Sequence, residues 1–444
     1  MAKNELVPGE PRLGWFIDGD ASTPDIAVML RDTGSAIELT IPLQGTFGLR
    51  GPYGRWWSEG MKFGDDPDRS RHSYAPPNEL LVEDADGTVV LVGCRPLGST
   101  SSFSAGRGRI VANFAVLGGR RLNYDKVHGI RTGIPGLAAW TNLSNIRVGM
   151  ERYTNGRVKS VEMNLSTAEP LKLARNLNLC IRPNWHTKRS YNSFQAFETV
   201  ALETTVAKPR TWNDHLQIHL GVADLLSIAA WQPFGFASTQ VMRRDDPTRD
   251  VAGHDHGEKW STVVSHRLPQ HTHWKKEPRF LFPWEEVGPR GISRWLKLRT
   301  SAGRAIGPLI NVLRSDNPWS HASVVQSGIA LESLGYYIDV TKNNGTHLNG
   351  RKQMNYKPGL QVILNDLGME PFDDIAGWIA RSNDCYMGSK HPDRPEPDSL
   401  ITLNTLRQNL IVLRCWIGRQ LGVSVGALVD SLETDPLTAE FLPG

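Results

Sequence analysis

Short apolar segments with alternating polar positions dominate the first two hundred residues. They are rich in Val, Ile, Thr and Phe, are separated by Gly, Asn, Asp and Pro, and include residues 27–30, 37–41, 89–92, 110–116, 158–163 and 197–205. Because side chains on a strand alternate between its two faces, this pattern predicts β-strands. Asp86-Gly87 and Asn155-Gly156 are signals for tight turns. We therefore expect a sandwich or an open barrel of antiparallel strands.

The hydrophobic period changes at Thr211, which is a suitable N-cap for a helix. The apolar residues that then share one helical face are Leu216, Leu220, Ala223, Leu226 and Ala230. Pro233 follows and cannot continue a helix. The pattern predicts a single helix that closes the β-rich region.

The chain after Trp284 has a helical period almost throughout. Helices are predicted over residues 292–311, 319–340, 360–367, 372–383, 400–421 and 425–432. Long helices with shorter ones between them are typical of a compact bundle. The predicted fold class is α+β, with a β-rich, sandwich-like domain and its closing helix in residues 1–275 and an all-α helical bundle in residues 283–444.

The length of 444 residues also favours two domains over one. The sequence has no apolar core of signal-peptide length near its start and no run of about 18 apolar residues, which predicts a cytoplasmic protein that does not span a membrane. The four cysteines are scattered and form no Cys-x-x-Cys pair. This spacing argues against a structural zinc site or a disulfide framework. Cys385 lies in a polar stretch, but nothing in the sequence marks it as an activated nucleophile.

The formal charge of +4 is too small to indicate a nucleic-acid binder by composition alone, although a local basic patch is compatible with it. Histidines are concentrated in residues 243–273, where His254, His256, His266, His271 and His273 occur. Paired histidines two positions apart can bind zinc, but a solvated hairpin or linker fits this stretch better. We predict no metal and no cofactor.

Arg55, Trp56 and Trp57 stand in a glycine-rich context within the β-rich part. Exposed aromatic side chains on such a domain can stack on sugars or bases. Tryptophan more often lies in a core or covers an edge. Carbohydrate binding therefore remains an alternative function at this point.

A polar stretch from Ala380 to Asp393 separates two apolar, helix-forming segments. We expect a short loop there, with Arg381, Asn383 and Asp384 on or just past the last turn of the preceding helix, and with Lys390 and His391 before Pro392. A cationic donor beside an imidazole is suited to binding phosphate and moving protons. Ordinary capping and turn chemistry explains the same residues equally well.

Three features of the second half together resemble the HEPN superfamily, and more narrowly the C-terminal domain of the anti-phage ApeA-like proteins. They are the segment Val325 to Gly335, the Asn-Asp and Lys-His element of residues 383–391, and the long closing helix. The first half is similar to the ApeA N-terminal domain. That likeness lies in Gly14-Trp15-Phe16, the long β-rich region, and the segment 211–216 that leads into the helix.

The resemblance implies a metal-independent, RNA-cleaving domain that forms a homodimer and acts in abortive infection after an unknown phage-derived trigger. In this chain the implied histidine is His391, its polar partner is Asn383 or Asp384, the arginine is Arg381, and the acidic residue of the first helix is Glu332. Nine residues separate Arg381 from His391, which is longer than the usual family spacing. Lys390 or Arg394 is the alternative source of the cation.

The function expected from this resemblance is that of a HEPN endoribonuclease. His391 would act as general base on a ribose 2′-hydroxyl or as general acid to the leaving oxygen, and Arg381 or Lys390 would stabilise the phosphorane. Asn383 would orient the phosphate or the histidine, and Glu332 would hold the arginine. The alternatives are a non-cleaving HEPN domain that binds RNA or another protein, and a carbohydrate-binding protein.

Overall fold

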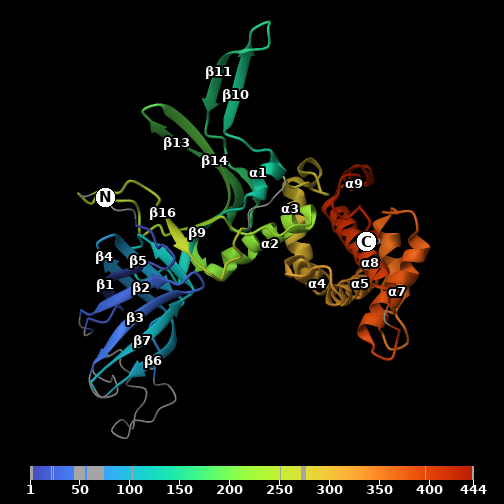
Figure 1. Ribbon diagram of the computed structural model, residues 1–444, viewed down its shortest axis with the longest axis horizontal. Helices are drawn as coiled ribbons and strands as arrows, with labels where there is room; N and C mark the ends of the chain where they lie inside the picture. The colour runs from blue at the N-terminus through green and yellow to red at the C-terminus, as the bar shows by residue number, and fades with distance from the viewer. Residues whose placement is uncertain are drawn as a thin grey trace. The chain divides into compact units, whose positions relative to one another are not determined.

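The computed structural model describes residues 4–21, 23, 25–44, 56–57, 75–102, 104–250, 252–271, 277–395 and 397–442 (Figure 1). The chain folds into two compact units that are built from interleaved segments. The first unit comprises Met1–Gly133, Leu202–Leu216 and Phe236–Gln270. The second comprises Ile134–Ala201, Gln217–Gly235 and His271–Gly444.

Antiparallel strands form the first unit. They are β1 (Pro11–Ile17), β2 (Ala27–Asp32), β3 (Ile37–Gln44), β4 (Glu79–Asp84), β5 (Gly87–Val92), β6 (Arg95–Ser101), β7 (Ala105–Ala112), β8 (Phe114–Leu117), β9 (Lys126–Gly133), β15 (Ser238–Met242) and β16 (Trp260–Val264). Their order in the sheet is β9-β15-β16-β8-β5-β4-β1-β2-β3-β7-β6. The predicted large antiparallel β-region is confirmed, and these strands follow one another in one continuous order.

One large hydrophobic cluster joins most strands of this unit, and β5 is buried on both of its faces. In β1 and β2 buried and exposed positions alternate strictly, as the period of a half-buried strand requires. Neighbouring strands from β8 to β7 all contribute buried apolar side chains to one cluster, among them Leu30, Leu39, Leu80, Leu91 and Ile110. Most of the cluster comes from the strands, and Leu6, Trp56 and Cys94 join it from outside them. A one-residue slip of a strand would turn its buried side chains to the other face, so strand register and core composition are fixed together.

The environment of Glu79, at the start of β4, disfavours the charged form of its carboxyl group. Its Oε1 atom is buried and has no hydrogen-bond partner among the described residues. Burial, followed by the negative charge of Asp125, raises the pKa of Glu79 from 4.5 to about 7. The folded protein therefore favours the protonated form of this side chain.

We expect this shift to make stability depend on pH. Between about pH 4.5 and 7 the folded state holds a proton on Glu79 that the unfolded state has lost, so the contribution is present at low pH and is lost as the pH rises through 7. Melting temperatures at pH 5 and pH 8 should differ less for Glu79→Gln than for the wild type. Exposed Glu10→Gln is the control, and an unchanged difference in Glu79→Gln would contradict the assignment.

Helices make up most of the second unit after residue 283. They are α3 (Trp284–Ser301), α4 (Gly303–Arg314), α5 (His321–Lys342), α6 (Tyr356–Leu367), α7 (Ile375–Lys390), α8 (Ser399–Leu421) and α9 (Val425–Leu432). The predicted helical character of this region is confirmed. Among the described residues, every helix is too short or too polar to span a membrane.

Local sequence explains where several of these helices begin and end. The helices α5, α7, α8 and α9 each have an N-cap side chain that accepts a hydrogen bond from a backbone N–H of the first turn. These N-cap residues are, in the same order, Ser320, Asp374, Asp398 and Ser424. The single helix predicted over residues 292–311 is in fact divided into α3 and α4 at Ala302, which has non-helical backbone angles. The break precedes Gly303, a poor helix former.

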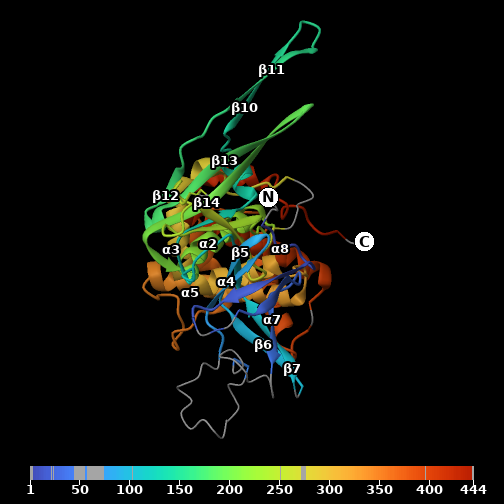
Figure 2. The ribbon, with the colours of Figure 1, turned by 90° about the vertical axis from the view of Figure 1, so that its left-hand side faces the viewer.

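The second unit also contains α1 (Gly136–Thr141), most of α2 (Trp212–Ala230), and the strands β10 (Ile146–Arg152), β11 (Val158–Leu165), β12 (Leu171–Ala174), β13 (Leu179–Ser190) and the first part of β14 (Ser193–Thr211). β10 pairs with β11 as a two-stranded sheet, and β13 lies between β12 and β14. The β10–β11 and β13–β14 hairpins both extend away from the helices of this unit (Figure 2).

A buried arginine on α8 forms an ion pair with the segment after α9 and hydrogen bonds with the end of α2. Arg414 is fully buried and binds Asp435 through two contacts of 2.7 Å, while its remaining donors reach the backbone oxygens of Ile228 and Ala229 at 2.7 and 2.8 Å. The last carbonyl groups of a helix have no partner within the helix. One side chain thus satisfies a buried carboxylate and two carbonyls at the end of α2.

Arg414→Met should lower the free energy of unfolding by about 3–5 kcal/mol, because it leaves the Asp435 carboxylate buried without its cation. Urea unfolding measures the change. Lys159→Met removes an exposed ion pair with Glu151 and should cost less than about 1 kcal/mol. Equal losses in the two variants would show that the buried pair contributes no more than a surface pair.

Candidate functional site

Helix α7 carries most of the side chains that the sequence singled out. The predicted loop from Ala380 to Asp393 is wrong for its first part, since α7 continues through Lys390 and His391 is the C-cap residue. The buried face of α7 consists of Trp378, Ser382, Cys385 and Tyr386. The prediction missed the continuation of the helix because most residues from 380 to 390 are polar. The buried residues nevertheless keep helical spacing.

This geometry separates two residues that the resemblance brings together. Arg381 and His391 are ten positions apart, which corresponds to about 15 Å of rise along the helix axis. Arg381 contacts Asp374 at 2.6 Å and Gln408 at 3.4 Å. Within one chain, the guanidinium of Arg381 therefore lies at a different level of α7 from the imidazole.

Asn383 and Asp384 contact each other. The amide of Asn383 donates to the Asp384 carboxylate at 3.0 Å. Asp384 is exposed and Asn383 is half-buried. The structure therefore leaves both at least partly accessible on α7, within one turn of Arg381.

Lys390 and Glu332 are brought together through a residue that the sequence did not single out. Tyr386 donates to Glu332 Oε2 at 3.0 Å, and Lys390 Nζ donates to the Tyr386 hydroxyl at 3.2 Å. The ammonium group also lies 5.0 Å from the centre of the Tyr386 ring. Burial, followed by the charge of Glu332, raises the pKa of Tyr386, so this phenol stays protonated and donates to the carboxylate.

Gly328 on α5 makes room for this arrangement. A Cβ atom at Gly328 would lie 2.2 Å from a ring carbon of Tyr386, which no packing tolerates. The ring of Tyr386 also packs 4.7 Å from that of Tyr356. Gly328 lies one turn before Glu332 on α5, which is the only link from the sequence-selected residues to Tyr386, and the sequence does not show which ring fills this space.

A cavity of about 660 Å³ lies beside the Glu332–Tyr386–Lys390 contacts. Its lining includes Glu332, Tyr336, Tyr356, Arg304, Lys352 and Met387. This volume is within the range of sites that hold a small molecule. Charged and aromatic side chains together suit a ligand with an anionic group and a ring.

A buried hydrogen-bond network fixes the helices around this cavity. Asn409 on α8 accepts from the indole of Trp378 and from the hydroxyl of Ser382, both at 2.9 Å, and donates to Ser327 at 3.1 Å. Ser382 also contacts the hydroxyl of Tyr356 at 2.9 Å. The network joins α5, α6, α7 and α8, and so it sets the position of Tyr386 on α7.

Asn409→Ala should lower the free energy of unfolding by about 2–4 kcal/mol, because it leaves two buried donors without an acceptor. Exposed Asn365, whose amide oxygen accepts from Gln361 at 3.0 Å, is the matched control. Asn365→Ala should change stability by less than about 0.5 kcal/mol. Similar urea midpoints for the two variants would show that the network does not hold the helices together.

Cys385 does not have the environment of a nucleophile. Its side chain is 1 % exposed, and burial raises the pKa of the thiol. A thiol is reactive as its thiolate, which burial disfavours. The structure therefore gives Cys385 a packing role.

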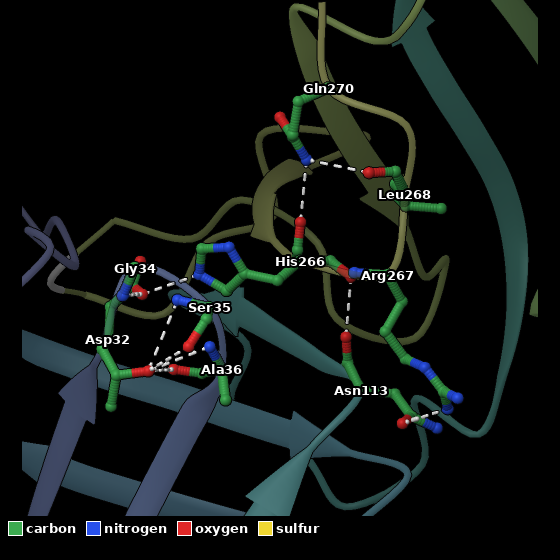
Figure 3. A network of polar contacts seen from close by, with 11 residues as sticks. Asp32, Gly34, Ser35, Ala36, Asn113, His266, Arg267, Leu268 and Gln270 are labelled. Atoms are coloured by element: carbon green, nitrogen blue, oxygen red, sulfur yellow. Dashed lines mark hydrogen bonds and ion pairs between the residues drawn. The ribbon is translucent and has the colours of Figure 1, made fainter. Parts of the chain in front are cut away.

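The histidine-rich stretch has contacts to carboxylates in the first unit. His266 Nε2 lies 2.7 Å from the buried Asp32, which also accepts from the backbone of Gly34 at 2.7 Å (Figure 3). Arg267 donates to Asn113 at 2.6 Å. A cavity of about 170 Å³ adjoins these side chains and is also lined by Arg95. These contacts attach residues 265–270 to the ends of β2 and β7.

The remaining histidines of this stretch do not assemble a larger cluster. His254 and His256 both contact Asp250, at 2.9 and 3.1 Å, and His273 lies outside the described residues. In the part of the chain that the structure describes, no group of three or more His, Cys, Asp or Glu side chains is arranged to hold a metal ion.

The paired tryptophans are packed and do not form an open platform. Trp56 is 3 % exposed and belongs to the core of the first unit. Trp57 packs over Gly108 and donates to the backbone oxygen of Arg109 at 2.9 Å. Arg55 lies outside the described residues. The core or edge-covering interpretation is therefore the one that the structure supports.

The architecture defines a protein with a large antiparallel sheet followed by a helical region that encloses a charged, aromatic cavity. The family model described as ApeA N-terminal domain 1 matches residues 12–295, which is more than half of the chain. The chain therefore belongs to the ApeA N-terminal domain 1 family, and the predicted likeness of the first half is confirmed. Membership supports a role in anti-phage defence. Comparison with curated proteins and with solved structures returns no match.

Proposed function

We propose that this protein is an anti-phage effector whose helical region is a HEPN-type endoribonuclease. The family match of the first part supports the defence role. The observation that carries the catalytic part is the end of α7, where Lys390 is bound through Tyr386 to Glu332, and His391 directly follows. The cation and the histidine are thus consecutive in the chain, and Glu332, which Lys390 reaches through Tyr386, lines the cavity.

The chemistry of these side chains fits metal-independent cleavage of RNA. His391 would remove the proton of a ribose 2′-hydroxyl, or deliver one to the leaving 5′-oxygen. Lys390, positioned by Tyr386, would stabilise the extra negative charge on the phosphorane. The products would be a 2′,3′-cyclic phosphate and a free 5′-hydroxyl.

Arg381, Asn383 and Asp384 enter this proposal through a second copy of the chain. They lie about two to three turns before His391 on α7, so a two-fold homodimer in which the two α7 helices run antiparallel would place one copy's Arg381 near the other copy's His391. Two-fold symmetry is the commonest symmetry of soluble oligomers. Asn383 or Asp384 would then orient the phosphate or the imidazole.

A second candidate is a non-cleaving HEPN domain that binds RNA or a protein partner. The separation of about 15 Å along α7 between Arg381 and His391 favours it, because one chain alone does not combine the two groups. Carbohydrate binding is not proposed, since Trp56 is buried and Trp57 covers β7.

His391→Ala should abolish both phage restriction and RNA fragmentation in cells, and Lys390→Ala should slow cleavage by the purified protein about 10²–10³-fold. Plaque counts, total-RNA integrity and detection of 2′,3′-cyclic ends provide the measurements. The control is His254→Ala, an exposed histidine of the first unit. Retained cleavage in His391→Ala removes the histidine from the mechanism. Retained RNA binding without any cyclic ends in the wild type supports the non-cleaving candidate.

A further inference from the structure

The β13–β14 hairpin exposes aromatic side chains to an unusual degree. Tyr191, in the turn, is fully exposed, and Phe194, Phe197 and Trp185 are 53 %, 41 % and 37 % exposed. Large apolar side chains that gather on an exposed surface usually mark a binding site. Residues 185–195 are exposed without interruption, so none of the residues that the structure describes covers the end of this hairpin.

Both faces of the hairpin end combine aromatic rings with cations. Residues two apart share a strand face, so Trp185 lies on the same side as Arg189, and His186 on the same side as Lys188. The rings of His186 and Phe197 stack, with their centres 5.0 Å apart and 14° between their planes. A planar ring pair, open to solvent and next to an ammonium group, is therefore already formed on one face.

The charge of this segment is of one sign. Residues 183–197 contain Lys188, Arg189 and His186 but no Asp or Glu. The end of this hairpin is thus an exposed basic and aromatic surface. Such a surface complements a flexible polyanion that carries rings of its own.

The neighbouring β10–β11 hairpin shows that exposure alone does not produce this combination. Its exposed apolar residues are mainly aliphatic and face one another across the strands, as Val148 does with Met163 and Met150 with Val161. It carries four cations, Arg147, Arg152, Arg157 and Lys159, but also the acidic residues Glu151 and Glu162, and Lys159 is paired with Glu151 at 2.7 Å. Apart from Tyr153, its exposed large apolar side chains offer no ring to stack on a base.

We propose that the end of the β13–β14 hairpin, residues 185–197, binds single-stranded RNA by stacking bases on its exposed rings and pairing phosphates with Lys188 and Arg189. The choice of RNA over DNA rests on the proposed ribonuclease function. The hairpin belongs to the same compact unit as α7. It would hold a strand for the site at the end of that helix.

Fluorescence anisotropy with a labelled 15-nucleotide single-stranded RNA tests the proposal in the full chain carrying His391→Ala. The double substitution Tyr191→Ala and Phe194→Ala should weaken binding at least tenfold, since each lost stack is worth about tenfold. Lys188→Gln with Arg189→Gln should reduce the slope of log Kd against log salt by about 1.4. Tyr153→Ala with Val161→Ala, on the other hairpin, is the matched control and should bind as the parent does.

Three results would overturn the proposal. They are RNA binding that the β13–β14 substitutions leave unchanged, duplex RNA that binds as tightly as the single strand, and a loss of self-association in sedimentation without any loss of RNA affinity. The last would identify the hairpin as an interface between copies of the protein.

A cleavage assay on the wild type separates this proposal from the ribonuclease function. If the His391→Ala protein binds RNA through the hairpin while the wild type cleaves nothing, the ribonuclease function fails and the RNA site stands. If the wild type cleaves RNA and the hairpin substitutions change neither binding nor cleavage, the RNA site fails and the ribonuclease function stands.

Discussion

The helical part of this protein is arranged around a positive charge that is completely removed from water. Arg414, on α8, is compensated by Asp435 and by two carbonyl oxygens at the end of α2. A buried charge is tolerated only when its partners are in place, so α2 and the segment after α9 have to meet α8 at one defined position. The buried network of Asn409 then fixes α5, α6 and α7 on the same helix.

That constraint determines which chemical groups meet at the cavity. Because α7 is helical through Lys390, the position of each side chain is set along the helix axis as well as around it. Lys390, Tyr386 and Glu332 converge at one end, whereas Arg381 pairs with Asp374 near the other. A site that needs both ends of α7 must be completed by a second copy. A site that needs only the Lys390 end is complete in one chain.

The structure keeps its two kinds of aromatic surface distinct. Trp56 is buried in the core of the first unit, and Trp57 packs against that core and over Gly108 of β7. The rings of the β13–β14 hairpin are instead exposed to solvent, near Lys188 and Arg189 in the sequence. Composition counts all of these rings alike. Their different exposure is a matter of tertiary structure, because the β13–β14 hairpin extends away from the helices of its own unit (Figure 1).

The sequence by itself determined the succession of a β-rich part and a helical part, because strand and helix periods are local properties of the chain. It also identified Glu332, Lys390 and His391 as chemically notable. It did not reveal that residues 380–390 are helical, since most residues of this stretch are polar and Ser382 interrupts the buried face that Trp378, Cys385 and Tyr386 form. Only tertiary structure decided this, because partners such as Asn409 and Gly328 lie far away in the chain. It likewise decided which tryptophans are buried and which rings remain exposed.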